Sequence, residues 1–354
     1  MKYSVFEKQL HQIIEPHILD VTPGLLVQAY QGGKKICDVR IGDTYAYYDL
    51  ASVTKIIFPV QAMMVAYDTG LWKLESKVVD FVPDFKHRDM TVLSLLNHSS
   101  GFKWWDKFFV DLANVSGADV KKNELLKKLN GEILEPQTES VYSDLGFMTL
   151  IFVLEGLYKK SIYDIWLEMK ERFYRGTTLE FHPDNTPKQP RNLYAPTEEC
   201  VWRKKLIQGE VHDENTWALG GVSTHSGLFG SIDDLGWYAL HMRSQLLGVA
   251  RLQIKLKTSQ LFAKRARPVG SGDWAMGFMM PTPGHASSGQ YFSLNSIGHL
   301  GFTGTSVWYD PKADFAIVIL SNRLIYGREP NHFKALRPKI HDWIVEAYRR
   351  STVV

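Results

Sequence analysis

The sequence predicts a mixed α/β (α+β) fold, in which an antiparallel sheet is flanked by terminal helices and interrupted by an inserted, mainly helical domain. Both ends of the chain contain pairs of short β-type runs separated by turn residues, and both also contain an amphipathic helix. The middle of the chain carries helical periodicity. Because hairpins and amphipathic helices must bury their apolar faces, the economical arrangement is one sheet built from both termini with helices on a face.

The N-terminal segment predicts a helix followed by a β-hairpin. Residues 3–14 place apolar and charged side chains at helical spacing. The runs 24–30 and 35–41 are β-type, and the turn 31–34 between them contains two glycines. Two antiparallel strands therefore open the fold.

The C-terminal segment predicts a second hairpin and a final helix. The runs 305–309 and 315–320 are rich in β-branched and aromatic residues, and the linking residues 310–314 contain proline. Residues 336–348 carry an apolar face at helical spacing.

The middle of the chain predicts the insertion. Four segments have helical periodicity, whereas 181–196 is dense in proline and asparagine and is expected to be irregular. We expect a discontinuous α/β domain with a helical insertion and the active site at their interface. The helical segments are 90–96, 123–129, 145–157 and 162–173. The expected α/β domain consists of residues 1–85 and 211–354, and the expected insertion consists of residues 86–210.

Composition limits the partners. The 354 residues include 41 Lys and Arg against 38 Asp and Glu, which gives no basic stripe for nucleic acid. Cys37 and Cys200 stand outside any zinc-ligand spacing and are expected to be buried apolar residues. No apolar run is long enough for a membrane span, and residues 1–14 lack an export signal, so a cytoplasmic chain is expected; a periplasmic chain is the alternative if a signal peptide has been removed. Oligomeric state is left open.

The segment 49–70 contains a candidate nucleophile and a candidate base. It reads as a largely apolar, buried helix that opens near Ser52 and is kinked at Pro59. Ser52 and Lys55 are three residues apart and share a helix face, so the amine is close enough to take the hydroxyl proton. The helix start also offers backbone N–H groups for an oxyanion. On pattern alone, the alternative is an N-cap serine followed by a snorkelling lysine.

Two other serine motifs do not offer a better candidate for the nucleophile. Ser100 and Lys103 repeat the spacing, but they run into a Trp-Trp-Asp loop and are interpreted as a chance match. No Gly-x-Ser-x-Gly sequence occurs, which disfavours an α/β-hydrolase.

Together, three motifs resemble the serine β-lactamase and penicillin-binding protein superfamily, in the branch of class C β-lactamases, DD-peptidases and related serine esterases. The first is Ser52-Val-Thr-Lys55, the second Tyr142-Ser-Asp144 and the third His299-Leu-Gly301. They follow the family's order and approximate spacing, and the resemblance covers about residues 24–343. It implies a β-lactamase/transpeptidase-like fold and acyl-enzyme chemistry without a metal or cofactor.

The resemblance also implies roles for single residues. Ser52 is the expected nucleophile, and Lys55 and Tyr142 share proton transfer, with His299 as a further catalytic residue. The oxyanion hole is expected from the backbone N–H groups of Ser52 and Phe302. Asp144, Gly301, Thr303 and His212 are expected to bind substrate. The alternatives are a core tyrosine at Tyr142 and a structural histidine at His299.

Two departures from the family pattern bear on the substrate. Leu300 stands where the family usually has threonine, whose hydroxyl binds a substrate carboxylate, although Thr303 or Thr305 could compensate. Asp144 replaces the usual asparagine with an acceptor-only anion that could pair with Lys55 and repel an acidic substrate. Both departures argue against an efficient β-lactamase.

The string 208–230 is similar to one in a subset of these hydrolases that includes lipolytic esterases. His212, Asp213 and Glu214 lie within it, but adjacent residues cannot easily converge on one metal ion, so we expect a wall of the active site, with purely structural hydrogen bonding as the alternative. Tryptophans could line a cleft for a glycan or acyl group; the candidates are Trp104, Trp105, Trp202, Trp217 and Trp308.

The sequence therefore favours a serine hydrolase that acts on a small ester or amide. A weak β-lactamase, or a DD-peptidase or D-aminopeptidase acting on peptidoglycan-type peptides, is the alternative within enzymes. A non-catalytic sensor or binding protein that retains the fold is the alternative from another class.

Overall fold

The computed structural model describes residues 4–135, 139–249 and 254–352. Its main sheet has five antiparallel strands in the order β2-β1-β10-β9-β8. The two predicted hairpins meet in this sheet, because β1 pairs with β10 from Leu25 opposite Ser321 to Gln31 opposite Phe315. The bounds are β1 (Gly24–Gln31), β2 (Lys34–Gly42), β8 (Ile297–Leu300), β9 (Ser306–Asp310) and β10 (Phe315–Ser321).

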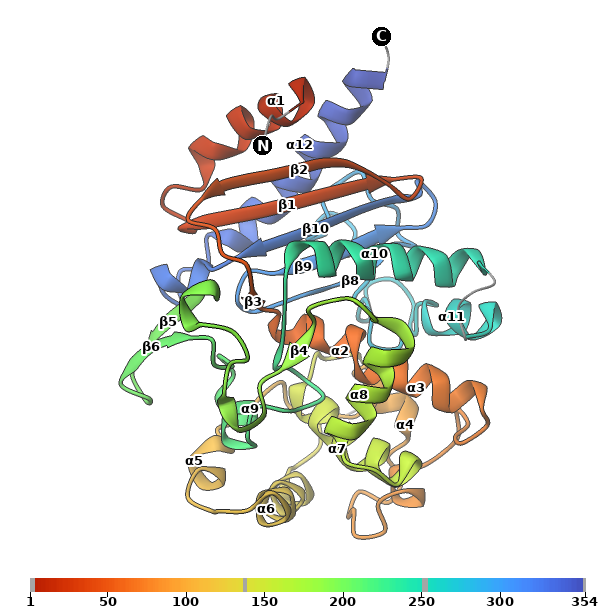
Figure 1. Cartoon of the computed structure of the whole chain (residues 1–354). Coiled ribbons are helices and arrows are strands. Elements are labelled where there is room, and N and C mark those ends of the chain that lie inside the picture. Colours follow the sequence, from red (N-terminus) through yellow and green to blue (C-terminus); the bar gives the residue numbers. More distant parts are fainter. Residues whose placement is uncertain (1–3, 136–138, 250–253, 353–354) are drawn as a thin grey trace.

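Helices cover both faces of the sheet (Figure 1). The terminal helices α1 (Val5–Ile14) and α12 (Phe333–Thr352) pack together on one face, where they bury Leu25 and Val27 of β1. The opposite face buries Leu26 against a larger core to which α10 (Ile232–Leu247) contributes. This alternation follows from the two-residue period of a strand. The predicted terminal helices are confirmed, except that residue 3 lies outside the described residues; α10 was not predicted.

A helical body lies below the sheet in Figure 1. Its helices at 92–96, 118–131, 144–158 and 162–173 confirm the four that periodicity predicts. The division at residues 86 and 210 stays a prediction. The bounds are α4 (Val92–Leu96), α5 (Phe109–Leu112), α6 (Ala118–Gly131), α7 (Asp144–Tyr158), α8 (Ile162–Phe173), α9 (Glu214–Ala218) and α11 (Leu256–Phe262), with short 3-10 turns η1 (Glu15–His17), η3 (Val78–Asp80), η4 (Pro183–Asn185), η5 (Arg191–Leu193) and η6 (Arg323–Tyr326).

Two small sheets were not predicted. One is β3 (Tyr48–Asp49), β7 (Leu228–Gly230) and β4 (Glu180–Phe181), and the other is the pair β5 (Pro196–Cys200) and β6 (Lys205–Gln208). Strands of two to five residues are too short for alternation to reveal. The segment expected to be irregular, 181–196, is mostly so, although it touches β4 and β5 at its ends.

The predicted kink in the buried helix is confirmed. The 3-10 turn η2 (Ala51–Val53) runs into α2 (Thr54–Ile57), and α3 (Pro59–Asp68) follows after a break at Phe58. Pro59 cannot donate a backbone hydrogen bond, so a new helix begins at the proline. Cys37 and Cys200 are buried free thiols, as expected.

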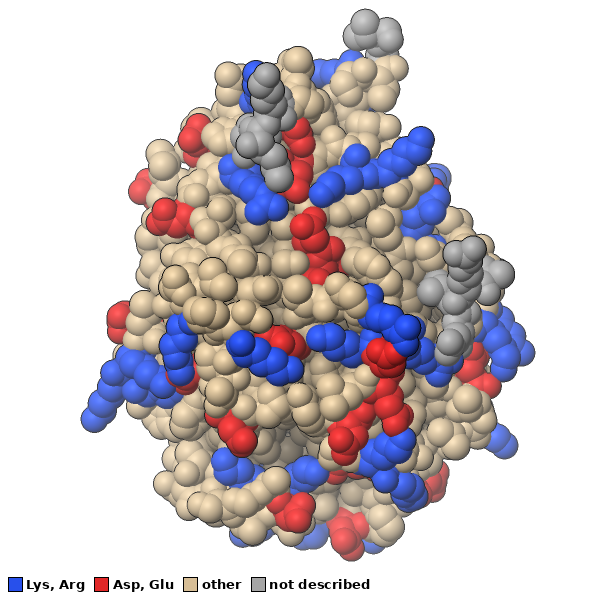
Figure 2. All heavy atoms as spheres, viewed as in Figure 1, with Lys and Arg blue, Asp and Glu red and all other residues tan. Residues whose placement is uncertain are grey.

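The surface and the helices add two observations. Figure 2 shows acidic and basic side chains interspersed on one face of the molecule, in keeping with the near-balanced composition. Within the described ranges, every helix is too short or too polar to cross a bilayer.

Candidate active site

Ser52 lies at the start of the broken helix, one turn before Lys55. The Lys55 Nζ lies 3.1 Å from Ser52 Oγ. Ala51 has a left-handed backbone with φ of 47°, a conformation that costs on the order of 1 kcal/mol or more for a residue with a Cβ. Asp49 holds this turn, because its Oδ1 accepts a hydrogen bond from the Ala51 amide at 2.8 Å. The backbone turn at Ala51 therefore determines where the Ser52 side chain points.

Lys55 is fully buried among three acceptors. Besides Ser52 Oγ, its Nζ donates to Asp144 Oδ1 at 2.6 Å and to the His225 carbonyl at 2.8 Å. Burial lowers the pKa of Lys55, and the Asp144 carboxylate offsets only part of this shift. The ammonium is therefore held in place and yields its proton more readily than a surface lysine does.

Tyr142 connects Ser52 to Asp144. Its Oη lies 2.7 Å from Ser52 Oγ and donates to Asp144 Oδ1 at 2.7 Å. Burial and the Asp144 charge raise the pKa of Tyr142 well above its usual range. The ring stacks on Trp274, with centroids 5.5 Å apart. Tyr142 can therefore accept a proton only if it gives up its own.

His299 lies behind Tyr142, with ring centroids 6.0 Å apart. Its Nδ1 contacts the Leu300 carbonyl at 2.7 Å, and because a carbonyl only accepts, Nδ1 carries the hydrogen. Among the described residues its Nε2 has no hydrogen-bond partner. Burial and the Lys55 charge lower the pKa of His299 to about 3. His299 is thus a neutral imidazole next to Tyr142, and its catalytic role stays a prediction.

The backbone N–H groups of Ser52 and Phe302 are free in the part of the chain that the structure describes. Both residues line one pocket. The Phe302 carbonyl accepts a hydrogen bond from Arg323 Nε at 3.0 Å, which fixes this turn after β8. Two free amides beside a hydroxyl are what an oxyanion hole requires.

Of the four expected substrate-binding residues, Asp144 and His212 line this pocket, and Gly301 and Thr303 do not. Gly301 is structural, because its amide donates within the turn and an added Cβ would fall 1.9 Å from a Thr305 oxygen. The buried Thr303 hydroxyl donates to the Asp49 carbonyl at 2.7 Å. This hydroxyl is therefore engaged within the turn, and the substrate-binding roles of Gly301 and Thr303 stay predictions.

Leu300 also lies away from Ser52. It packs against the core beneath α12 and lines a different cavity. The Thr305 hydroxyl donates to the Leu50 carbonyl at 3.0 Å, so it is engaged within the fold, and compensation by Thr303 or Thr305 stays a prediction. The hydroxyl hydrogens of Thr303 and Thr305 are thus both used within the fold, and the Leu300 side chain has none.

The pocket around Ser52 has a volume of about 150 Å³. Of the tryptophans named above, Trp104 and Trp105 line it as a stacked pair, whereas Trp308 is buried in the core. Its lining residues are Ala51, Ser52, Trp104, Trp105, Tyr142, Asp144, His212, Asp213, Glu214, His225, Ser226, Phe302 and Arg328.

The charged rim of this pocket is internally paired. Arg328 contacts Glu198 through two hydrogen bonds of 2.8 and 2.7 Å, and Glu214 at 2.5 Å. Burial would raise the pKa of Glu198, but Arg328 and His212 lower it to about 2. Glu198, Cys200 and Glu214 place possible metal ligands within 4.8 Å of one another. Arg328 already supplies the cation there, so these residues do not fit a metal.

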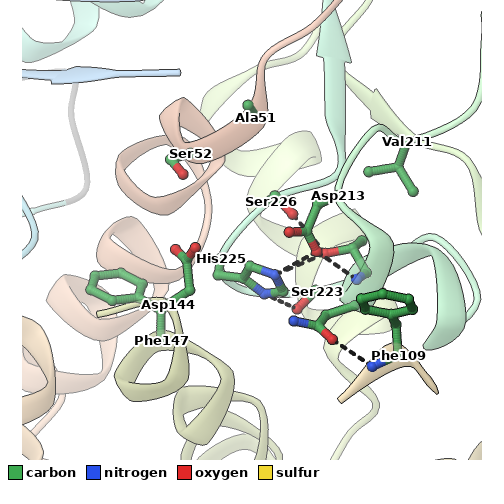
Figure 3. Close-up of polar contacts among 12 residues, drawn as sticks. Ala51, Ser52, Phe109, Asp144, Phe147, Val211, Asp213, Ser223, His225 and Ser226 are labelled. Atoms are coloured by element: carbon green, nitrogen blue, oxygen red, sulfur yellow. Dashed lines mark hydrogen bonds and ion pairs between the residues drawn. The ribbon is translucent and has the colours of Figure 1, made fainter. Parts of the chain in front are cut away.

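Sequence reasoning missed a pair formed by the partly buried Asp213 and the buried His225. Asp213 Oδ1 lies 2.9 Å from His225 Nε2, and Ser223 Oγ contacts His225 Nδ1 at 2.7 Å (Figure 3). Burial would raise the pKa of Asp213, but His225 lowers it. Asp213 also caps α9 by accepting from the Thr216 amide at 2.7 Å. The pair therefore fixes the loop that contains the His225 carbonyl, which accepts a hydrogen bond from Lys55.

The string 208–230 contained the signal for this pair, because it supplies both residues. His212, Asp213 and Glu214 are adjacent in the sequence, whereas the partner of Asp213 lies 12 residues along the chain. Figure 3 shows Asp213 and His225 facing each other, while His225 and Asp144 approach the Ser52 helix from different elements.

Comparison with known proteins places these contacts in context. The family model described as Beta-lactamase matches residues 12–337. A protein of Salmonella agona named as a D-alanyl-D-alanine carboxypeptidase is 29% identical over 328 residues, which cover 83% of this chain and 73% of the relative.

Two solved structures share the fold. D-amino acid amidase from Ochrobactrum anthropi superposes with a TM-score of 0.71 at 17% identity, covering 99% of this chain and 100% of the amidase. EstCE1, a hydrolase with promiscuous acyltransferase activity, superposes with a TM-score of 0.68 at 17% identity, covering 94% of this chain and 98% of its own.

Proposed function

The chain belongs to the beta-lactamase family and is a serine hydrolase, and on that premise we propose that it hydrolyses a small ester or amide through an acyl-enzyme on Ser52. One observation carries the proposal: Ser52 Oγ contacts both Lys55 Nζ and Tyr142 Oη, at 3.1 and 2.7 Å. A serine hydroxyl is a weak nucleophile until a neighbouring base removes its proton.

In the acylation step, Ser52 Oγ attacks the carbonyl carbon and forms the new C–O bond. The Ser52 proton passes to Tyr142 Oη while Tyr142 gives its own proton to Asp144. Tyr142 remains a neutral phenol throughout, which agrees with its raised pKa. Lys55 shares the role, since its neutral form, favoured by burial, can take the Ser52 proton itself.

The rest of the cycle reverses these transfers. The backbone N–H groups of Ser52 and Phe302 stabilise the negative oxygen of the tetrahedral intermediate. The bond to the leaving group breaks as Asp144 returns its proton through Tyr142 to the departing oxygen or nitrogen. Water then adds to the acyl-enzyme, loses its proton along the same path, and releases the acid with Ser52 restored.

The pocket favours a substrate without a free carboxylate. The hydroxyls of Thr303 and Thr305 are used within the fold, and Arg328 is neutralised by Glu198 and Glu214. An acidic substrate would also approach the Asp144 carboxylate. We therefore place ester or amide hydrolysis, with esterase-like action favoured, ahead of the alternative, a weak β-lactamase or a D-alanyl-D-alanine peptidase.

The name of the Salmonella relative supports that alternative. Turnover of p-nitrophenyl butyrate, nitrocefin and a D-alanyl-D-alanine peptide by the same preparation separates the two. We expect ester turnover to exceed both of the others; faster release of D-alanine would replace the esterase proposal with the peptidase.

Ser52→Ala tests the nucleophile in the same assay, with Ser100→Ala as its matched control. We expect ester hydrolysis to fall to background in Ser52→Ala and to persist in Ser100→Ala. Full activity of Ser52→Ala would overturn the assignment. Absence of all hydrolysis from the unaltered chain, across esters, amides and peptides, would favour a binding or sensor protein that retains the fold.

A further inference from the structure

Arg337 on α12 is a buried cation without a counter-charge among the described residues. It is 5% exposed, and its Nε has no hydrogen-bond partner in that part of the chain. Its guanidinium carbon lies 4.9 Å from the Phe333 ring centre. Burial and the nearby Arg323 charge lower the pKa of Arg337 to about 9. Because buried charges in proteins are normally paired, this guanidinium requires an anion that the described residues do not provide.

Arg337 lines a cavity of about 950 Å³. The cavity lies between the segment 279–294 and the first half of α12, and Leu300 and Phe292 form part of its apolar wall. The Gln290 amide donates to Asp342 Oδ1 at 2.7 Å, which ties the segment to the helix. A cavity of this size and shape holds a small organic molecule rather than a lone ion.

The charges of this cavity favour an anion. Lys334 lines it one helical turn before Arg337, so both cations lie on the same side of α12. Asp342 is the one carboxylate among the described lining residues, and it is engaged by the Gln290 amide. The first turn of α12 lies against the cavity and adds the partial positive charge of a helix N-terminus.

We propose that this cavity binds the phosphate group of a small phosphorylated molecule, with Arg337 and Lys334 contacting the phosphate oxygens. Guanidinium groups pair with phosphate through two parallel hydrogen bonds, and two cations beside a helix N-terminus suit a doubly charged anion better than a carboxylate. The apolar wall takes the organic group that carries the phosphate.

This site is distinct from the one around Ser52. Strand β8 separates them, because His299 lies against the Tyr142 side of the strand and Leu300 lines the cavity on the other side. No described residue lines both pockets. A phosphorylated ligand is therefore expected to bind without competing with an ester substrate.

Thermal unfolding and calorimetry on the whole chain test the proposal. The probes are phenyl phosphate, inorganic phosphate and benzoate, each compared with sodium chloride at equal ionic strength. We expect phenyl phosphate to bind and to raise Tm further as its concentration increases, inorganic phosphate to do so more weakly, and benzoate to have the smallest effect. No binding of either phosphate compound would overturn the site, and equal binding of benzoate would overturn its preference for phosphate.

Three variants locate the site. Arg337→Gln should weaken phenyl phosphate binding at least about tenfold, the loss expected for one charge-assisted hydrogen bond. Lys334→Gln should weaken it in the same direction, and since Lys334 is exposed, this variant decides the test if Arg337→Gln does not fold. Lys73→Gln, an exposed lysine that does not line the cavity, is the control and should bind as the unaltered chain does. Unchanged affinity in the two cavity variants would overturn the proposal.

Discussion

Tyr142→Phe tests the proton path with the least disturbance of the pocket. The change removes one oxygen, which lies 2.7 Å from Ser52 Oγ and 2.7 Å from Asp144 Oδ1. The phenylalanine ring keeps the stacking against Trp274, so the shape of the site is preserved. Ser52 loses the neighbour that accepts its proton, while Lys55 still contacts it at 3.1 Å.

The expected loss follows from these contacts. A positioned general base contributes about 10²- to 10⁴-fold to the rate, or about 3–5 kcal/mol of transition-state stabilisation. The folded state loses two hydrogen bonds of one hydroxyl, each worth about 1 kcal/mol net. We therefore expect kcat to fall by about two to four orders of magnitude, with a modest loss of stability and little change in KM.

The assay measures kcat and KM for p-nitrophenyl butyrate together with urea unfolding. Tyr158→Phe is the matched control, because Tyr158 Oη donates to the Ala62 carbonyl at 2.7 Å and does not line the Ser52 pocket. The control should lose a comparable part of its stability and keep its kcat. If Tyr142→Phe retained the kcat of the unaltered chain, Lys55 alone would be the base and the Tyr142 path would be refuted.

Three further changes have definite expectations. Asp144→Asn leaves the Lys55 ammonium buried without its carboxylate, which should cost about 3–5 kcal/mol in urea unfolding at pH 7. Because the pKa of Lys55 is lowered in the folded state, the unfolded state binds more protons, and the stability of this variant should rise between pH 7 and pH 9; a flat profile would contradict the buried charge. Asp213→Asn should lower kcat about tenfold to hundredfold with KM nearly unchanged, since it loosens His225 and the carbonyl that holds Lys55; a change in KM alone would argue against positioning. Leu300→Thr should leave nitrocefin turnover unchanged, because this side chain lines the other cavity; a clear gain would show that it reaches the Ser52 pocket.

The sequence pattern predicted those parts of the fold that depend on neighbouring residues, such as hairpin turns and the spacing along a helix. The hairpins at 24–41 and 305–320 each carry their own turn residues, and Ser52 and Lys55 are one turn apart in any helical backbone. The start of α10 also carries a local signal, because Ser231 and Asp234 form a capping box.

Contacts between distant segments were beyond local reasoning. Tyr142 joins Ser52 across 90 positions, and its candidacy came from the family resemblance rather than from spacing. The pairing of Asp213 with His225 depends on how a loop closes. The side of the sheet that Leu300 occupies depends on the register of β8 with β9, where Leu300 lies opposite Ser306. No periodicity in a four-residue strand fixes that register.

The intact mass of the chain after exposure to a fluorophosphonate tests whether Ser52 is the nucleophile. The probe loses fluoride and forms one phosphorus–oxygen bond with an activated serine. We predict one adduct per chain, carried by the peptide that contains Ser52, absent from Ser52→Ala and fully retained in Ser100→Ala. An adduct that persists in Ser52→Ala, or no adduct on the unaltered chain, would contradict the account.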